Sequence, residues 1–172
     1  GGAITTNDET LAKKVRMIAN HGRLEKYNHE FEGRNSRLDG LQAAILNVKL
    51  NYLNNWTDRR NEIARIYSDG LSMIENITTP FINNNSRHAF HLYVIRLDKR
   101  DELQNFLKDN NISTGIHYPI ALPDLPAYEY LNQKNKFKAS IISKQILSLP
   151  MGEHLVDKDI SYVISKIKLF FN

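Results

Sequence analysis

From Gly33 to Ala44 the sequence reads Gly-Arg-Asn-Ser-Arg-Leu-Asp-Gly-Leu-Gln-Ala-Ala, which looks like a turn followed by the start of a helix. Glycine permits a tight turn, and Asn35 or Ser36 can cap a helix by accepting a hydrogen bond from an exposed backbone N–H. Apolar residues then recur at steps of three and four, which places them on one helical face. They are Leu38, Leu41, Ile45, Val48 and Tyr52. We therefore predict a buried helix from Ser36 to about Asn51.

Asn35 and Arg37 are the polar residues at the predicted N-terminal mouth of this helix. Backbone N–H donors and the helix dipole favour an anion at such a position. The same spacing also fits a simpler interpretation, in which the helix is capped and Arg37 is a surface residue. Spacing alone leaves both interpretations open.

The amino-acid composition limits the classes of protein to which the chain can belong. The chain has 172 residues, of which 41% are hydrophobic and 24% charged, and this suits one or two compact units with a hydrophobic core. It has no cysteine, which excludes disulfides and thiolate chemistry and fits a cytoplasmic protein. No apolar run is long enough to cross a membrane, and we expect no signal peptide. The net charge is +4, but the lysines flank apolar helical positions without interleaved aromatics, so we expect no nucleic-acid partner. Metal-spaced histidines are absent too, so we expect no metal site.

The first part of the chain has mainly helical patterning. A short strand is predicted over Gly2–Thr6, and a capped helix with an inward apolar stripe follows Asn7. Glycine in the usual left-handed stop position ends that helix at His21–Gly22. After a loop over Arg23–Glu32, two long helices are predicted between Ser36 and Met73. The inward residues of the first helix are Leu11, Val15 and Ile18, and Asn54–Asn55 is the predicted break between the two long helices.

The pattern changes to α/β after about residue 75. Loop residues around positions 72–85 place a domain boundary there. Strand, helix and strand patterns then predict a small α/β unit covered on one face. The predicted strands are Ala89–Leu97, Ile112–Ile116 and Leu147–Leu149, and the predicted helices are Arg100–Asp109, Lys138–Ile146 and Asp157–Phe171. His91 is interpreted as a buried sheet histidine.

The stretch from Gly33 and six further blocks, in order, resemble the DegT/DnrJ/StrS family of aminotransferases that depend on pyridoxal 5′-phosphate (PLP) and act on nucleotide-linked keto sugars. Their order along the chain carries the resemblance, since each block alone is a weak signal. Besides the stretch from Gly33, the blocks include Gly1–Thr6, Leu11–Arg16 with Asn20–Gly22, Arg59–Arg60, His91–Arg96, Ile116–Pro119 and Leu147–Met151.

The resemblance implies the C-terminal part of the aspartate-aminotransferase (PLP fold type I) architecture. Residues 1–75 would be the tail of the large PLP-binding domain, and residues 76–172 the small C-terminal α/β domain. In the family the lysine that binds the cofactor lies shortly before the Gly-Gly found here at Gly1–Gly2. We therefore expect no catalytic lysine in this chain, no covalent PLP and no activity from the chain alone.

The resemblance also implies roles for particular residues. Asn35 matches an asparagine that reaches into the neighbouring subunit of a homodimer and binds the cofactor phosphate. Arg37 matches an arginine near the substrate in the partner's active site, while His117 and Tyr118 match a pair that approaches the nucleotide sugar. The structural alternatives are an interface arginine for Arg37 and a packed strand end for His117. Relatives usually differ at Ala121, Pro123 and Ser140, so the following loop is expected to suit a different sugar.

The sequence thus supports three hypotheses. The first is a C-terminal segment of a nucleotide-sugar aminotransferase that uses an amino donor, glutamate by family resemblance, in surface-polysaccharide or modified-sugar biosynthesis. The second is a truncated, non-catalytic homologue that acts as a binding or interaction module. The third is a segment of a PLP-dependent sugar dehydratase of the same fold, in which a histidine replaces the cofactor lysine.

Overall fold

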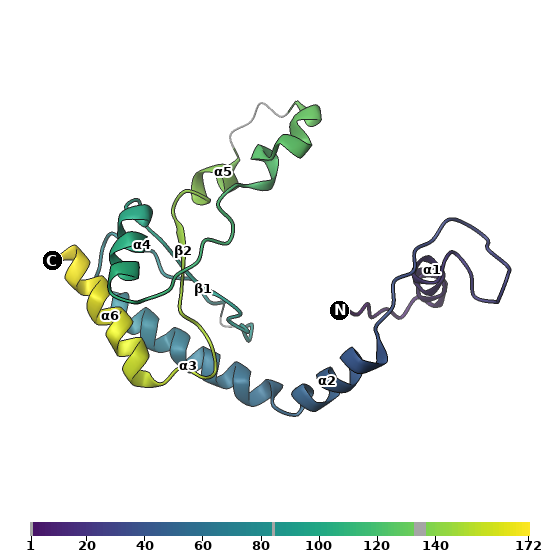
Figure 1. Ribbon diagram of the computed structural model, residues 1–172, viewed down its shortest axis with the longest axis horizontal. Coiled ribbons are helices and arrows are strands. Elements are labelled where there is room, and N and C mark those ends of the chain that lie inside the picture. Colours follow the sequence, from purple (N-terminus) through teal and green to yellow (C-terminus); the bar gives the residue numbers. More distant parts are fainter. Residues whose placement is uncertain (1, 84, 133–136) are drawn as a thin grey trace. The chain divides into compact units, whose positions relative to one another are not determined.

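The computed structural model describes residues 2–83, 85–132 and 137–172 (Figure 1). Contacts between backbone positions divide the chain into two compact units, residues 1–53 and 54–172. The predicted domain boundary between residues 75 and 76 refers to the domains of the family fold and stays a prediction.

The first unit contains two helices, α1 (Glu9–Ala19) and α2 (Gly40–Leu50). Asp8 caps α1 by accepting a hydrogen bond from the Leu11 backbone N–H at 3.0 Å, so the predicted cap at Asn7 was wrong by one residue. Met17 is the buried residue of α1. The predicted strand over Gly2–Thr6 is wrong: these residues are not assigned to a strand, because no other described segment pairs with them.

Helix α2 differs from its prediction in both its start and its surroundings. It begins at Gly40, and its N-cap residue is Asp39 rather than Asn35 or Ser36. None of its residues is buried, and Leu41 and Val48 of the predicted stripe are 76% and 62% exposed. The prediction of a buried helix is therefore wrong for this chain by itself, because the period of the apolar residues says nothing of what covers them.

The second unit is built on a small antiparallel sheet. Strand β1 (Tyr93–Arg96) pairs with β2 (Ile146–Leu149), and Val94 lies opposite Ser148. Single bridges extend the sheet on both edges, from Thr78 to Arg96 and from Gly115 to Ser148. The strand predicted over Ala89–Leu97 is present but shorter, and the one over Ile112–Ile116 is reduced to the Gly115 bridge. His91 lies before β1 and is exposed, so its interpretation as a buried sheet histidine is wrong.

Three helices cover one face of this sheet and form the core with it (Figure 1). They are α3 (Leu53–Leu71), α4 (Arg100–Asp109) and α6 (Asp157–Phe171). The bounds predicted for α4 and α6 are confirmed, while the break between the long helices lies at Asn51–Tyr52 instead of Asn54–Asn55. The buried residues of the helices are Ile63, Ala64, Tyr67 and Leu71 of α3, Leu103 and Leu107 of α4, and Ile160, Val163, Ile164 and Ile167 of α6.

Two arginines connect α3 to the start of α6 and to the segment before it. Arg59 contacts the Asp157 carboxylate at 2.7 Å, and Arg60 contacts Glu153 at 2.8 Å. Arg60 also donates to the backbone oxygen of Phe90 at 3.1 Å. The carboxylate of Asp157 is therefore paired with an arginine of α3, and the N-cap residue of α6 is Val156.

The remaining elements lie between Gly115 and β2. They are the 3₁₀ helices η1 (Leu122–Asp124) and η2 (Pro126–Leu131) and the short helix α5 (Lys138–Ile142). The helix predicted over Lys138–Ile146 is therefore shorter than expected, since Ile146 already belongs to β2.

Candidate functional site

The loop between α1 and α2 folds back onto the end of α1. Asn20 forms an antiparallel bridge with Asn35, and the Ser36 backbone N–H donates to the Ala19 carbonyl at 2.9 Å. The Arg34 N–H donates to the Ile18 carbonyl at 2.7 Å, and the His21 N–H to the Arg34 carbonyl at 2.9 Å. These bonds fix the backbone on both sides of Asn35.

Two glycines make this fold-back possible. Gly22 has a φ of +75°, a left-handed conformation that glycine adopts without strain. Helix α1 itself ends at Ala19 with Asn20 as its C-cap, so it stops slightly before the predicted end at His21–Gly22. A β-carbon on Gly22 would lie 1.6 Å from the Phe31 carbonyl oxygen, and one on Gly33 would lie 2.0 Å from the Gly22 nitrogen. Since no side chain fits at either position, the backbones can pack directly against each other just before Asn35.

Asn35 and Arg37 are thus two positions apart on this fixed stretch of backbone, and their side chains are available to bind a ligand. Both residues are exposed. Within the described residues, neither the Asn35 amide nor the Arg37 guanidinium makes a hydrogen bond or an ion pair. An amide and a guanidinium can both donate to phosphate oxygens. This part of the chain is suited to bind an anion.

His117 and Tyr118 form a second local arrangement, in the second unit. The His117 Nδ1 lies 2.9 Å from the Ser148 hydroxyl oxygen on β2. The two rings of His117 and Tyr118 meet edge to face with centroids 5.8 Å apart, and Tyr118 is 74% exposed. His117 is thus not a packed strand end but an exposed imidazole fixed through one nitrogen. The structure places Asn35 and Arg37 in one unit and this pair in the other.

An apolar hollow of about 610 Å³ lies beside Tyr118. Its lining is apolar apart from the Tyr118 and Ser143 hydroxyls and the backbone. It consists of Tyr118, Pro119, Ile120, Ala121, Leu122, Leu125, Ala139, Ile142, Ser143 and Ile146. Ala121 is among these residues, so the composition of this loop shapes the hollow.

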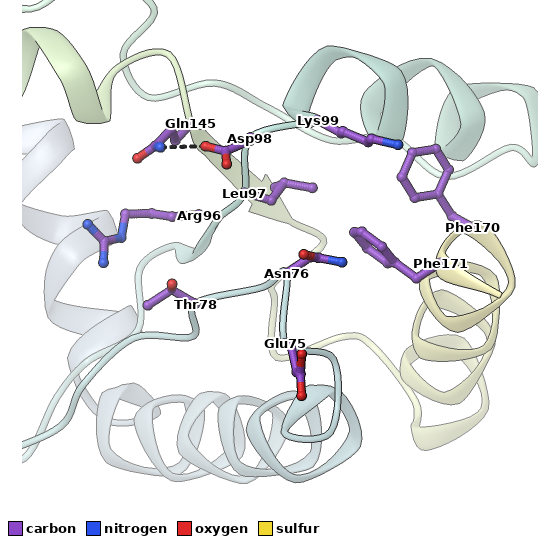
Figure 2. Close-up of a pocket in the computed structure, with 10 residues that line it drawn as sticks. All are labelled: Glu75, Asn76, Thr78, Arg96, Leu97, Asp98, Lys99, Gln145, Phe170 and Phe171. Carbon is purple, nitrogen blue, oxygen red and sulfur yellow. Dashed lines mark hydrogen bonds between the residues drawn. The ribbon is translucent and has the colours of Figure 1, made fainter.

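A second hollow, of about 540 Å³, lies at the opposite edge of the sheet, where Thr78 pairs with Arg96 (Figure 2). Figure 2 shows the rings of Phe170 and Phe171 on one side and Arg96 with Thr78 on the other. The remaining lining residues are Glu75, Asn76, Leu97, Asp98, Lys99 and Gln145. Two cations and two acids balance in charge, and Gln145 donates to Asp98 at 2.7 Å. Sequence patterns gave no signal for this hollow, because its residues come from four separate segments.

Two further searches concern metals and membranes. Among the described residues there is no group of three or more histidine, cysteine, aspartate or glutamate side chains that could hold a metal ion. Of the helices within the same residues, none combines the length and apolar character needed to span a bilayer.

Comparison with known proteins identifies the family. Residues 1–168 match the DegT/DnrJ/EryC1/StrS aminotransferase family. The chain is 41% identical over 170 residues to the erythromycin biosynthesis sensory transduction protein EryC1 of Saccharopolyspora erythraea, covering 98% of this chain and 46% of that protein. It is 38% identical over 170 residues to dTDP-3-amino-3,4,6-trideoxy-alpha-D-glucose transaminase of Streptomyces venezuelae, covering 98% of this chain and 45% of that one.

Solved structures agree in fold. The crystal structure of S. venezuelae DesV in complex with a ketimine intermediate superposes with a TM-score of 0.90 at 35% identity, covering 97% of this chain and 46% of that chain. The predicted α/β aminotransferase architecture is thereby confirmed, as is the family resemblance. The chain spans less than half the length of these relatives.

Proposed function

Because the chain belongs to the DegT/DnrJ/EryC1/StrS aminotransferase family, we propose that it forms the C-terminal part of a PLP-dependent enzyme that transfers an amino group to a nucleotide-linked keto sugar. The observation that carries this proposal is the family match over residues 1–168 of 172. Relatives named as transaminases of dTDP- and UDP-linked sugars support it. Glutamate is the proposed amino donor, the cytoplasm the proposed location, and surface-polysaccharide or modified-sugar biosynthesis the proposed context.

Asn35 is the proposed ligand of the cofactor phosphate. The donor chemistry fits the group, since an amide N–H without a partner in the described structure stands on a backbone that is bonded on both sides. A charge-assisted bond to phosphate is stronger than a neutral one. When bound, PLP carries the amino group between donor and acceptor; the lysine that anchors it in the family is proposed to come from the longer protein.

Arg37, His117 and Tyr118 are the proposed contacts to the nucleotide sugar. The Arg37 guanidinium is suited to two oxygens of one diphosphate. The imidazole of His117 can donate to a phosphate or sugar oxygen, and the exposed Tyr118 can stack or donate through its hydroxyl. The apolar hollow beside Tyr118 would receive an uncharged part of the substrate.

A homodimer is part of the same proposal. Helix α2 is apolar around most of its surface, and helices of that kind are buried in proteins that are fully assembled. The partner is proposed to be a second copy, in which Asn35 and Arg37 of one subunit serve the active site of the other. The exposed residues on the predicted stripe of α2 would then lie at or near the subunit interface.

The proposal is tested with the longer protein that contains this chain. It is incubated with PLP, isotopically labelled glutamate and a panel of dTDP- and UDP-linked keto sugars, and the products are analysed by mass spectrometry. We expect the label in an amino sugar. Loss of water from the sugar without incorporation of label would instead identify the dehydratase, and an absence of any turnover would contradict an enzymatic role.

A further inference from the structure

Ser148 occupies an unusually constrained position on β2. It lies opposite Val94 of β1, and on its other side it exchanges two backbone hydrogen bonds with Gly115, at 2.7 and 3.1 Å. The residues on either side of it, Leu147 and Leu149, point into the core, so the Ser148 side chain points to the other face of the sheet. Only 4% of Ser148 is exposed. Its hydroxyl is therefore both buried and fixed in direction.

Gly115 provides the space in which the His117 imidazole meets this hydroxyl. A β-carbon at residue 115 would lie 2.5 Å from the Cε1 of His117, so the ring rests directly against the Gly115 backbone. In that position its Nδ1 is 2.9 Å from the Ser148 oxygen. Within the described part of the chain, the Nε2 of the same ring has no hydrogen-bond partner.

The position of the protons follows from the partners available. A neutral imidazole has one N–H and one bare nitrogen. If Nδ1 carried the hydrogen it would donate to Ser148, and the serine O–H would have no acceptor among the described residues. A buried donor without a partner bears the full cost of its desolvation. If Ser148 donates to a bare Nδ1, the buried serine hydroxyl has its acceptor, and the hydrogen of the imidazole is on the exposed Nε2.

We propose that Ser148 is a positioning residue that holds His117 in the Nε2–H tautomer, so that the free nitrogen of the ring is a hydrogen-bond donor. The oxygen that receives this bond would belong to the phosphate or sugar of the nucleotide-linked substrate, and this last step alone rests on the proposed function. The assignment of the tautomer depends only on the contacts between Ser148, Gly115 and His117.

The tautomer is measured by nuclear magnetic resonance on the chain with isotope-labelled histidine. The chain has six histidines, and a His117→Gln variant assigns the signals of residue 117 by their loss. Spectra are recorded over a series of pH values, and the tautomer is taken from the high-pH plateau, where the histidine signals no longer change with pH. We expect Nδ1 of His117 to give the signal of a bare acceptor nitrogen and Nε2 that of a protonated one. An Nδ1–H signal, or a mixture of tautomers in the unmodified chain, overturns the proposal.

Substitutions of Ser148 distinguish a role in positioning His117 from a contribution to the stability of the fold alone. Ser148→Ala should give a mixture of tautomers at His117, and Ser148→Thr, which keeps the hydroxyl, should restore the single form. Ser143→Ala is the matched control, since Ser143 is equally buried but donates to the Ser140 carbonyl instead of a histidine. A Ser148→Ala chain that folds and keeps the single tautomer contradicts the proposal. Should that variant fail to fold, the spectrum of the unmodified chain still decides.

A kinetic measurement in the longer enzyme distinguishes this inference from the proposed function. Ser148→Ala should raise the KM for the nucleotide sugar about three- to tenfold, as expected for one hydrogen bond, and leave kcat nearly unchanged. An unchanged KM together with a fixed tautomer in the chain would refute the substrate contact of His117 while leaving the role of Ser148 intact. A mixture of His117 tautomers in the unmodified chain would refute the role of Ser148 whatever the kinetics.

Discussion

Gly33 lies against Gly22 so closely that a β-carbon at residue 33 would be 2.0 Å from the Gly22 nitrogen. This contact between two backbones joins the end of α1 to the residue that precedes Asn35 by two positions. The backbone that carries Asn35 is therefore held in place by a glycine contact two residues before it. The proposed binding of the cofactor phosphate by Asn35 therefore depends on this packing of Gly33 against Gly22.

Gly33→Ala should open the loop. We expect a local destabilisation of about 1–3 kcal/mol, because the added methyl group meets backbone atoms that cannot move independently. Amide hydrogen exchange at Arg34 and Ser36, whose N–H groups close the loop, should accelerate roughly tenfold to a hundredfold. The control is Gly40→Ala, where no atom lies within 4 Å of the new β-carbon. Equal exchange rates in both variants would show that the contact is unimportant.

The stability of the second unit should fall in strong alkali. Tyr67 is fully buried and donates to the Pro150 carbonyl at 2.9 Å. Burial, and secondarily the neighbouring Tyr93, raises the pKa of Tyr67 above its ordinary value of 10.0. The unfolded chain therefore loses this proton at a lower pH than the folded one. The contribution of protonated Tyr67 to the free energy of unfolding is therefore fully present below pH 10. It declines above pH 10, by up to about 1.4 kcal/mol per pH unit.

Denaturant unfolding at several pH values above 10 measures this decline. Tyr67→Phe cannot ionise and should have a shallower dependence on pH, although its stability at neutral pH is lower because one hydrogen bond is lost. Tyr130→Phe is the control, since Tyr130 is 73% exposed and should leave the slope unchanged. Parallel curves for the unmodified chain and Tyr67→Phe would argue against the role of burial.

The chain by itself should self-associate through α2. Ile45 lies on the apolar stripe and is 53% exposed, and large apolar surfaces favour association. Ile45→Glu should shift the mass measured by light scattering toward the monomer. Asn47→Glu adds the same charge to the same helix away from the stripe and should have little effect. A monomer at high concentration before any substitution would contradict the proposed interface.

The chain by itself should form no stable covalent complex with PLP. The family resemblance implies that the cofactor lysine lies shortly before Gly1–Gly2, so we expect none of the thirteen lysines of this chain to take that role. We expect borohydride treatment of the chain with PLP to give scattered, substoichiometric labelling, detected by peptide mass spectrometry. One lysine labelled stoichiometrically would mean that the position of the cofactor lysine has been misassigned.

The sequence predicted the elements whose packing is local and missed the features that depend on distant partners. The stripes of α4 and α6 gave their bounds, because each stripe faces one core within the second unit. The break near Asn54–Asn55 was wrong, since α3 continues through both asparagines. Burial of α2 was wrong because periodicity identifies an apolar face without identifying what covers it.

The candidate site shows the same limit. The resemblance indicated His117 and Tyr118, and the structure shows them together, with an apolar hollow beside Tyr118. The contact between Ser148 and His117 could not be predicted, since it depends on the bridge that aligns Gly115 with β2. Leu147–Met151 was recognised as a block, but nothing in it distinguished Ser148. The roles of Asn35 and Arg37 remain predictions, because both concern a partner subunit.

Complementation between two inactive variants of the longer enzyme tests the central claim most directly. One subunit carries a substitution of the cofactor lysine and the other Arg37→Ala, or Asn35→Ala at limiting PLP. If Asn35 and Arg37 act across the interface, one of the two sites in a mixed dimer has no lesion. We predict that mixing restores transamination, with Asn35→Ala alone losing cofactor and Arg37→Ala alone retaining it. Mixed dimers that are confirmed by mass and remain as inactive as either parent would contradict the assignment.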